Sequence, residues 1–382
     1  MTRVLLVTND FPPTIGGIQS YLRDFVERLD PREVVVFCST QDPQAARRFD
    51  EAAEFSVYRW PRRVMLPTPA VAHEMRRIIA AESIDVVWFG AAAPLGLLAP
   101  AARSAGARRV IATTHGHEVG WAMLPGARQA LRRVFRGADV VTFISAYTRN
   151  RLRKVLGATR VAHVPSGVST RVFRPASARI RADTRARLGV GNDEPMAIVI
   201  SRLVPRKGQD QLIRAWPQVR RRVPGARLVV VGGGRYGRTL NILKQRADRL
   251  SGATGAGIVM TGRLEQEAMR DALAASDVFA MPARTRFGGL DVEGLGIVYL
   301  EAQACGVPVI AGTSGGAPET VGEGCGQIVD GRDIEAIADA LAAWLSNRRA
   351  ASEAGRAGRA YVEREWTMEA MTLRLRHVLG LS

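Results

Sequence analysis

The stretch Asp291-Val-Glu-Gly-Leu-Gly-Ile-Val-Tyr-Leu-Glu-Ala302 places two glutamates eight positions apart, one before and one inside a predicted helix. Its two glycines make a loop that other groups can approach closely, and the apolar run over 297–304 predicts a short helix. Glu293 therefore lies at a helix entrance, where outward-pointing peptide N–H groups favour anions, and Glu301 lies about one turn inside. Such a place suits a phosphate with a polyhydroxyl group beside it. The alternative is a capping carboxylate and an unrelated surface glutamate.

The bulk composition is typical of a soluble globular protein with two domains. The chain has 382 residues, more than one core of ordinary size accommodates, and 47% are hydrophobic against 24% charged. No apolar run approaches the roughly 20 residues of a membrane span, and the first strand reaches charge too early for a signal peptide. The three cysteines (Cys38, Cys305 and Cys325) show no metal-site spacing and are odd in number, which favours a reducing cytoplasm.

The net charge is strongly positive, at +18 from 54 basic and 36 acidic residues. Such an excess predicts anionic partners: nucleic acid, acidic lipid or phosphorylated substrates. Aromatic residues are sparse, and neither a zinc-finger nor an RNA-recognition pattern is present, so nucleic acid is the weaker interpretation of the charge and is not expected as a partner.

The first half of the chain alternates short apolar strands with amphipathic helices. Continuous Val and Ile runs separated by helices predict a parallel sheet covered on both faces, in one doubly wound domain over residues 1–170. The expected strands are 4–8, 34–39, 55–58, 85–89, 109–113, 140–144 and 161–164, and the expected helices are 18–29, 69–81, 95–105, 125–136 and 146–156.

A second series of strands and helices follows a hinge. Residues 165–175 lose periodicity and 177–192 are polar and basic, so the hinge is expected here and the second Rossmann-like domain over 171–365. Its expected strands are 197–201, 227–231, 258–261, 278–281, 307–311 and 327–329, and its expected helices are 209–219, 236–250, 266–275, 297–304, 333–345 and 350–363. A last helix at 368–379, within the segment 366–382, is expected to pack back on the first domain. The fold class is therefore α/β, with two doubly wound domains facing a central cleft.

Two loops that precede helices have the composition of phosphate sites. The first follows strand 4–8 and carries Gly16 and Gly17, which let a phosphate reach the backbone at a helix start. It does not read G-x-G-x-x-G, so a nicotinamide dinucleotide is not indicated. The second carries Arg202 and Lys207, a planar fork and a mobile point charge that suit a diphosphate. The alternative for this second loop is a solvated basic surface.

A histidine directly follows strand 109–113, in the sequence His115-Gly-His-Glu118. Its side chain is expected to project from the strand end, where it can hydrogen-bond a substrate hydroxyl or stabilise developing charge. Two histidines at i, i+2 without a matching carboxylate cluster make a poor zinc site, and the basic loop already supplies the charge that a metal would contribute. No metal site is therefore predicted.

The predicted helix over 69–81 is apolar on one side and basic on another. The apolar stripe, expected to be buried against the sheet, consists of Val71, Met75, Ile78 and Ile79. The basic residues of this region are Arg62, Arg63, His73, Arg76 and Arg77. A basic helix of this kind can rest on anionic lipid head groups, which predicts contact with a membrane surface, and the alternative is a solvated face.

In order and spacing, these motifs resemble the retaining family 4 glycosyltransferases of GT-B fold. The resemblance covers essentially the whole chain and rests on Gly16-Gly17, His115, Arg202 with Lys207-Gly208, and Glu293 with Glu301. Two further stretches, Asn9-Asp-Phe-Pro-Pro and His115-Gly-His-Glu-Val-Gly-Trp-Ala-Met-Leu-Pro, are similar to the members that transfer mannose from GDP-mannose to phosphatidylinositol mannosides. Ser201 stands where many relatives have glycine, which is a minor departure.

This resemblance implies a role for each motif. Arg202 and Lys207 bind the diphosphate, and Glu293 binds hydroxyls of the donor sugar. The resemblance also places His115 on the donor sugar and Glu301 on the ribose. The complete implied donor site is Gly16, Gly17, Arg202, Lys207, Gly262, Arg263, Leu264, Glu293, Gly294, Leu295, Gly296, Ile297 and Glu301, with the base recognised through backbone groups of 262–264. The implied acceptor and membrane residues are Asp10, Gln19, Arg62, Arg63, His73, Arg76 and Arg77.

The resemblance implies a metal-independent enzyme, without a cofactor, whose catalytic residues are His115, Glu293, Arg202 and Lys207. It would transfer α-mannose from GDP-mannose to a phosphatidylinositol mannoside, as the second mannose, at the inner face of the cell membrane. The expected partners are GDP-mannose, that glycolipid and an anionic membrane surface. Two alternatives stay open: a family 4 transferase that uses another nucleotide sugar or a soluble acceptor, and a non-catalytic protein that binds anions or lipid.

Overall fold

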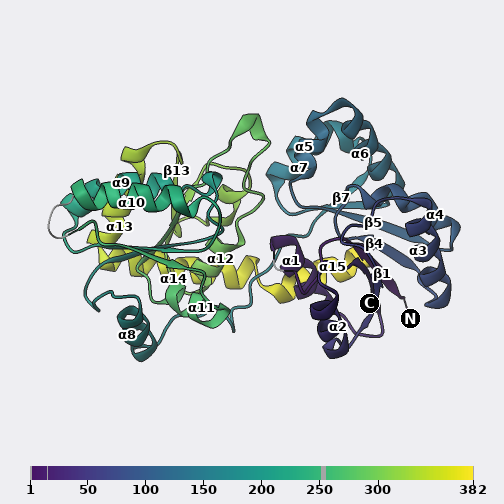
Figure 1. Cartoon of the computed structure of the whole chain (residues 1–382), viewed down its shortest axis with the longest axis horizontal. Helices are drawn as coiled ribbons and strands as arrows, with labels where there is room; N and C mark the ends of the chain where they lie inside the picture. The colour runs from purple at the N-terminus through teal and green to yellow at the C-terminus, as the bar shows by residue number, and fades with distance from the viewer. Residues whose placement is uncertain (1, 15, 251–254, 382) are drawn as a thin grey trace. The chain divides into compact units, whose positions relative to one another are not determined.

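A computed structural model describes residues 2–14, 16–250 and 255–381 of the chain (Figure 1). Its contacts divide it into two compact units: unit 1 runs to Ser166 and resumes at Glu369, and unit 2 is Gly167–Met368. The division falls slightly before the expected boundary at residue 170. Position 15, inside the glycine loop of unit 1, lies outside the described residues.

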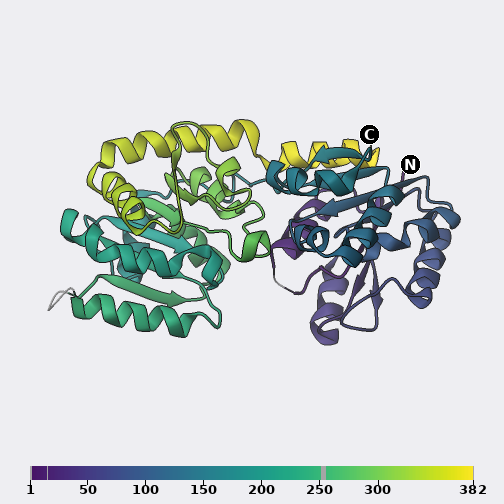
Figure 2. The same cartoon turned by 90° about the horizontal axis from the view of Figure 1, so that it is seen from above.

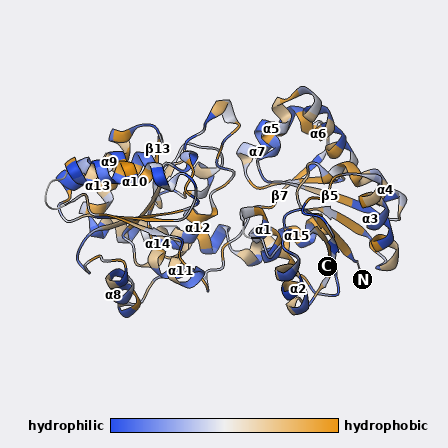
Figure 3. Ribbon diagram, viewed as in Figure 1, coloured by the Kyte–Doolittle hydropathy of each residue, from blue (hydrophilic) through white to orange (hydrophobic). Residues whose placement is uncertain are grey.

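Unit 1 is built on a parallel sheet. Within the described residues this sheet has seven strands in the order β3-β2-β1-β4-β5-β6-β7. Every residue of β1 and β2 is buried, as expected for a parallel sheet covered on both faces, and Figure 3 shows strands mostly in the hydrophobic colour. The strands are β1 (Val4–Thr8), β2 (Val34–Ser39), β3 (Ser56–Trp60), β4 (Val86–Phe89), β5 (Arg109–Thr114), β6 (Val140–Phe143) and β7 (Arg160–His163).

The helices of unit 1 include two that the sequence pattern did not predict, α2 and α5. Ala46 is the buried residue of α2 and α5 spans six residues, so neither has a long apolar period. The helix expected over 95–105 is a 3-10 turn followed by a short α-helix. The helices are α1 (Gly17–Val26), α2 (Pro43–Ala52), α3 (Pro69–Ala81), η1 (Leu95–Leu98), α4 (Ala99–Ser104), α5 (Glu118–Met123), α6 (Pro125–Gly137), α7 (Ala146–Leu156) and α15 (Met368–Leu379).

The last helix, α15, packs within unit 1 after the chain has completed unit 2. Met371, Leu375 and Leu379 on this helix are fully buried, and Arg376 Nη1 lies 2.9 Å from Glu33 Oε2. An apolar face and an ion pair therefore hold the C-terminal segment against the beginning of the chain.

Unit 2 contains a second parallel sheet, with six strands among the residues described and the order β10-β9-β8-β11-β12-β13. Helices α9, α10 and α13 pack together beside this sheet, and α12 packs against α14 (Figure 1). In Figure 2, α10, in green, and α14, in yellow, lie on opposite sides of unit 2. The strands are β8 (Met196–Ile200), β9 (Arg227–Val231), β10 (Ile258–Gly262), β11 (Val278–Met281), β12 (Val309–Gly312) and β13 (Gly326–Val329). The helices are α8 (Ala178–Arg187), η2 (Pro205–Lys207), α9 (Gln209–Arg222), α10 (Gly237–Leu250), α11 (Gln266–Ala274), η4 (Phe287–Gly289), α12 (Ile297–Ala304), η5 (Ala317–Thr320), α13 (Ile334–Ser346) and α14 (Arg348–Glu365).

Helix α8 lies within the stretch where the hinge was expected. Its Arg185 side chain is fully buried and donates to the Ala275 carbonyl at 3.0 Å, while Arg185 Nη1 lies 3.4 Å from Asp277 Oδ2. The polar character of residues 177–192 therefore reflects a helix attached by ion pairs and hydrogen bonds, which apolar periodicity does not detect.

Both sheets place loops at the C-terminal ends of their strands, where open α/β sheets bind ligands. The loops that carry the candidate site residues follow β1 and β5 in unit 1, and β8, β9, β10, β11 and β12 in unit 2. No helix in the described part of the chain is both long and apolar enough to cross a membrane.

Candidate functional site

The basic loop of unit 2 follows β8. At Gly208 it lies against the chain that follows β11. Gly208 has φ +80°, and a Cβ on it would lie 2.3 Å from the carbonyl oxygen of Pro282. Only glycine fits this approach. The contact brings Lys207, on one loop, to Glu293, on another.

Lys207 and Glu293 form a close, largely buried ion pair, with Lys207 Nζ 2.6 Å from Glu293 Oε2. The neighbouring Arg206 reaches the same region: its Nη1 lies 3.2 Å from Asp291 Oδ1 and its Nε 3.9 Å from Glu293 Oε2. Two cations therefore face two carboxylates at the entrance of α12. Such a cluster can exchange partners with an anionic ligand and with hydroxyl groups.

The backbone of Glu293 is fixed by the glycine loop at 314–316. The Glu293 amide donates to Ser314 Oγ at 3.2 Å, and the Gly316 amide donates to the Glu293 carbonyl at 3.0 Å. At Gly315, φ is +60° and a Cβ would lie 1.7 Å from that carbonyl oxygen. This loop therefore determines where the Glu293 carboxylate lies.

Helix α12 begins as predicted, with Glu301 inside it. Its N-cap, Gly296, has φ +84° and provides no side-chain cap, so the first amides of the helix face outward for an anion. Leu295 is buried, and Gly294 and Ile297 are partly buried, so these positions shape the helix entrance.

The loops after β8, β9 and β10 meet through glycines. A Cβ on Gly232 would lie 1.9 Å from the Ser201 carbonyl oxygen, and one on Gly233 would lie 2.7 Å from Arg263 Nε. The loop of Arg202 and the predicted base-binding segment are therefore neighbours through the β9 loop. Arg202 is exposed, and in the described ranges its guanidinium has no carboxylate partner. Gly262 and Arg263 are exposed, and Leu264 packs on the core.

In unit 1, His115 directly follows β5, as predicted, and is held from two sides. Its Nε2 lies 2.7 Å from the Gly90 carbonyl oxygen, and its ring meets the Tyr21 ring edge to face at 4.9 Å. Burial lowers the pKa of His115 to about 4, so the ring is neutral near pH 7. Because a carbonyl only accepts, Nε2 carries the proton and Nδ1 keeps a lone pair for a hydroxyl donor.

The glycine loop of unit 1 holds the two predicted acceptor residues together. Gln19 Nε2 donates to Asp10 Oδ1 at 2.8 Å. The Gln19 side chain occupies the space where a Cβ on Gly16 would lie, whereas nothing lies near a Cβ on Gly17. Burial raises the pKa of Asp10, with His117 opposing this effect and Glu118 adding to it. Asp10, Gln19 and His117 therefore form one polar cluster beside β1.

Sequence reasoning missed the roles of three charged residues. Glu118 is fully buried, and its Oε2 accepts from the amides of His115 and Gly116, both at 3.0 Å. The signal for it in the sequence was a carboxylate three residues after His115. The other two are Arg206 and Asp291, whose pairing links loops 85 residues apart and leaves no local signal.

The basic region of α3 has its apolar stripe buried, as expected. His73, Arg76 and Arg77 are exposed, and Arg77 pairs with Glu74 on its own helix, with Nη2 2.7 Å from Oε1. Arg62 and Arg63 line an open hollow together with Thr40, Gln41 and Arg47. The basic side chains of this region are thus available to an anionic surface.

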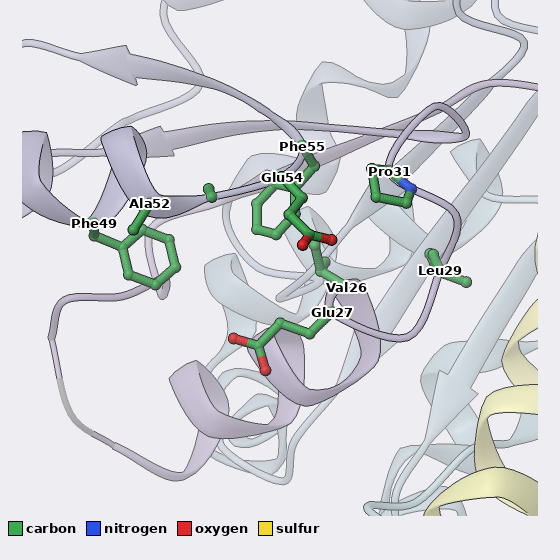
Figure 4. A pocket seen from close by; sticks show the side chains of 9 residues that line it. Val26, Glu27, Leu29, Pro31, Phe49, Ala52, Glu54 and Phe55 are labelled. Carbon is green, nitrogen blue, oxygen red and sulfur yellow. The ribbon is translucent and has the colours of Figure 1, made fainter.

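A separate pocket of about 330 Å³ in unit 1 contains none of the predicted site residues (Figure 4). Its lining combines apolar side chains with two glutamates: Val26, Glu27, Leu29, Pro31, Phe49, Ala52, Ala53, Glu54 and Phe55. These glutamates make it unsuited to a phosphate. Among the described ranges, no group of three or more His, Cys, Asp or Glu side chains is arranged to hold a metal ion.

Two glycosyltransferase families match this chain. The family described as "Glycosyltransferase Family 4" matches residues 15–172, and "Glycosyl transferases group 1" matches residues 180–361. Together they cover most of both units, including the basic loop and α12.

Relatives with similarity over nearly the whole chain have a stated activity. The GDP-mannose-dependent monoacylated alpha-(1-6)-phosphatidylinositol monomannoside mannosyltransferase of Corynebacterium glutamicum is 54% identical, over 99% of this chain and 97% of its own. The GDP-mannose-dependent alpha-(1-6)-phosphatidylinositol monomannoside mannosyltransferase of Mycobacterium tuberculosis is 52% identical, over 98% and 97%.

Solved structures share the fold at low sequence identity. Anabaena HepE, determined in complex with UDP, superposes with a TM-score of 0.83 at 18% identity, covering 99% of this chain and 100% of its own. Sucrose-phosphate synthase from Thermosynechococcus elongatus gives 0.79 at 21% identity, covering 100% and 98%. The predicted fold class, two Rossmann-like α/β domains, is confirmed.

Proposed function

The chain belongs to the family 4 glycosyltransferases, enzymes of GT-B fold, and from this premise we propose that it transfers α-mannose from GDP-mannose to a phosphatidylinositol mannoside. The observation that carries the proposal is the cluster of Lys207, Arg206 and Glu293 at the uncapped start of α12. It places cations for a diphosphate beside a carboxylate for sugar hydroxyls. The identity of 54% to a GDP-mannose-dependent relative supports mannose and guanine in particular.

In the proposed donor site, loops of unit 2 bind the diphosphate, the sugar hydroxyls, the ribose and the base. Arg202 and Lys207 bind the diphosphate. The diphosphate then replaces Glu293 as the anionic partner of Lys207. Glu293 then accepts hydrogen bonds from hydroxyls of the mannose, and Glu301 binds the ribose. Residues 262–264, next to Arg202 through the β9 loop, contact the base. His115 accepts a hydrogen bond from the sugar through Nδ1.

The proposed reaction is a same-face displacement with retention of configuration. The bond between the mannose C1 and the phosphate oxygen breaks, and the acceptor hydroxyl oxygen bonds to C1 from the same face. The departing phosphate oxygen takes the hydroxyl proton, so no enzymic nucleophile is needed. Negative charge grows on the diphosphate as the bond breaks, and Arg202 and Lys207 stabilise it. Positive charge develops on the sugar ring in the transition state, and the neutral imidazole of His115 does not repel it.

The proposed acceptor is a phosphatidylinositol mannoside that receives its second mannose at the inner face of the membrane. Asp10 and Gln19 are suited to acceptor hydroxyls, because the hydrogen bond between them uses only Asp10 Oδ1 and one N–H of Gln19 Nε2. The exposed basic residues Arg62, Arg63, His73, Arg76 and Arg77 suit lipid phosphates. Peripheral attachment to an anionic bilayer follows from this assignment.

The test is transfer of label from GDP-mannose. Purified protein incubated with radiolabelled GDP-mannose and vesicles that contain phosphatidylinositol monomannoside should give a labelled dimannoside lipid with α configuration. Glu293→Gln serves as the inactive control. Label found only in free mannose, with lipid and soluble acceptors alike, would contradict the proposal. Transfer only from a UDP-sugar, or only to a soluble acceptor, would replace it with the corresponding alternative.

A further inference from the structure

The loop between β11 and α12 carries two exposed apolar side chains near its middle. Phe287 is 67% exposed and Leu290 is 56% exposed. A single exposed apolar side chain on a protein surface needs no explanation. Phe287 and Leu290 lie three residues apart in one turn before α12. Together they form a small apolar projection, the 287–290 tip.

The backbone of this tip is stiff. Phe287 has φ +49°, a conformation that costs a non-glycine residue energy, and Gly288 and Gly289 follow at +63° and +106°. Two hydrogen bonds join the chain on either side of the tip: the Arg286 amide donates to the Asp291 carbonyl at 2.9 Å, and the Asp291 amide donates to the Arg286 carbonyl at 3.3 Å. Strain of this kind persists only where the surrounding structure maintains it, so the outward position of Phe287 is built into the fold.

The tip also carries a positive charge and is connected to the proposed donor site. The Arg286 guanidinium carbon lies 4.6 Å from the centre of the Phe287 ring. Arg286 Nη1 lies 3.5 Å from Asp291 Oδ2, and Asp291 in turn pairs with Arg206 beside Glu293. An aromatic ring, a leucine and a stacked arginine thus project from the same ion-pair network that holds the sugar-binding carboxylate.

We propose that the 287–290 tip is a membrane contact of unit 2: Phe287 and Leu290 insert into the acyl–glycerol region of a phospholipid surface, and Arg286 pairs with a lipid phosphate. This inference rests on the proposed function, in which the acceptor is a glycolipid. It adds a contact on the donor-binding unit to the basic residues of unit 1. The tip thereby holds the donor site at the surface where the acceptor resides.

The chemistry of the tip favours a lipid over a protein partner. A stable protein interface buries about 800 Å² on each partner, far more than two side chains provide. A bilayer accepts a small apolar insertion when basic residues accompany it. The net charge of +18 favours an anionic surface in the same way.

Vesicle binding tests the inference directly. The full-length protein, the variant Phe287→Ser/Leu290→Ser and the control Ile242→Ser/Leu250→Ser are sedimented with vesicles of phosphatidylcholine and phosphatidylglycerol. The control removes two apolar side chains of unit 2 that are 63% and 72% exposed on α10. The tip variant should bind about tenfold more weakly than the wild-type protein, because two side chains leave the apolar phase, and the control should change little. Equal binding by the tip variant and the wild type would overturn the inference.

Activity on two forms of the acceptor provides the second readout. Transfer to phosphatidylinositol monomannoside in vesicles is compared with transfer to its deacylated, water-soluble counterpart. The tip variant should lower the ratio of the first rate to the second by about tenfold. An equal loss on both acceptors would indicate disruption of the donor loop and overturn the membrane role. A wild-type protein that binds vesicles but uses neither acceptor would contradict the proposed function, while the vesicle comparison still decides the inference.

Discussion

Lys207 and Glu293 show how single residues determine what the site can bind. Each neutralises the other in a largely buried contact. In the proposed donor complex, Lys207 therefore binds the diphosphate only when a sugar hydroxyl replaces it at Glu293. A donor that carries both groups can make this exchange without leaving a buried charge unpaired. Free phosphate lacks the second group and should bind more weakly. Arg202, exposed and without a carboxylate partner in the described ranges, has no contact to exchange.

We expect Lys207→Ala and Arg202→Ala each to weaken GDP binding by about 1.5–3 kcal/mol, the worth of a charged hydrogen bond. Titration calorimetry with GDP measures this loss. Arg132→Ala on α6, an exposed arginine outside the site, is the control. GDP affinity that stays unchanged in Lys207→Ala or in Arg202→Ala would refute the diphosphate assignment of that residue.

His115 should make the stability of unit 1 depend on pH. Its pKa is about 4 in the folded chain and about 6.5 when unfolded, so between these values the unfolded state binds the additional proton. Stability from this residue is therefore complete above about pH 6.5 and decreases as the pH falls towards 4, by at most about 3 kcal/mol.

The variant His115→Gln tests this expectation, because its amide can still donate to the Gly90 carbonyl but does not titrate. Urea unfolding followed at pH 5 and pH 7 should show a smaller pH difference in the variant than in the wild type. An identical difference in both would mean that other groups cause the acid sensitivity.

At the scale of elements, the site is assembled by loops that glycines bring into close contact. Gly208 brings the basic loop onto the chain after β11, Gly232 brings the β9 loop onto Ser201, and Gly315 fixes Glu293. None of these contacts involves a functional side chain. The glycines are visible in the sequence, but the sequence contains no information on which loop each of them would touch.

Gly315→Ala should impair donor binding, whereas Gly324→Ala should not. Both glycines have positive φ, so backbone strain should cost each variant about 1 kcal/mol of stability, and Gly315→Ala should lose more because its Cβ also meets backbone atoms. Only the Cβ at position 315 meets the Glu293 carbonyl oxygen; nothing lies near one at position 324. We expect GDP-mannose affinity to fall at least about tenfold in Gly315→Ala alone. Equal affinities in the two variants would remove the 314–316 loop from the account of Glu293.

Helix α3 should contribute to membrane binding without contributing to donor binding. Its apolar stripe is buried, so Arg76→Ala/Arg77→Ala leaves the core intact and removes two exposed charges. Vesicle affinity should fall by about 1 kcal/mol per arginine at low salt and less at high salt. Arg132→Ala/Arg136→Ala on α6 is the matched control. Vesicle binding by the α3 variant that equals the control would exclude α3 from the membrane surface.

At the scale of the whole molecule, each unit contributes a different part of the proposed chemistry. In the proposal, unit 2 supplies the cations and carboxylates for a nucleotide sugar. Unit 1 supplies the neutral histidine for the donor sugar and the polar pair for the acceptor. In the proposed donor site, arginine and lysine supply the positive charge that a metal ion supplies at other phosphate sites. The enzyme should therefore keep its transfer rate in EDTA. Its 54% identity to a GDP-mannose-dependent relative separately predicts tighter binding of GDP than of UDP in calorimetry. A rate that disappears in EDTA and returns with Mg²⁺ would overturn the metal-independent mechanism.

The sequence alone determined the α/β class, most strands and the position of α12, because buried parallel strands are long apolar runs that local periodicity detects. It did not predict α2 and α5, and it marked the stretch containing α8 only as a polar hinge, because helices that are short or attached by ion pairs lack that period. Only the tertiary structure paired Lys207 with Glu293, added Arg206 and Asp291, and set the tautomer of His115 through Gly90. Those contacts join residues 25 to 86 positions apart, and nothing in the local sequence specifies which loop ends meet when strands are ordered in a sheet.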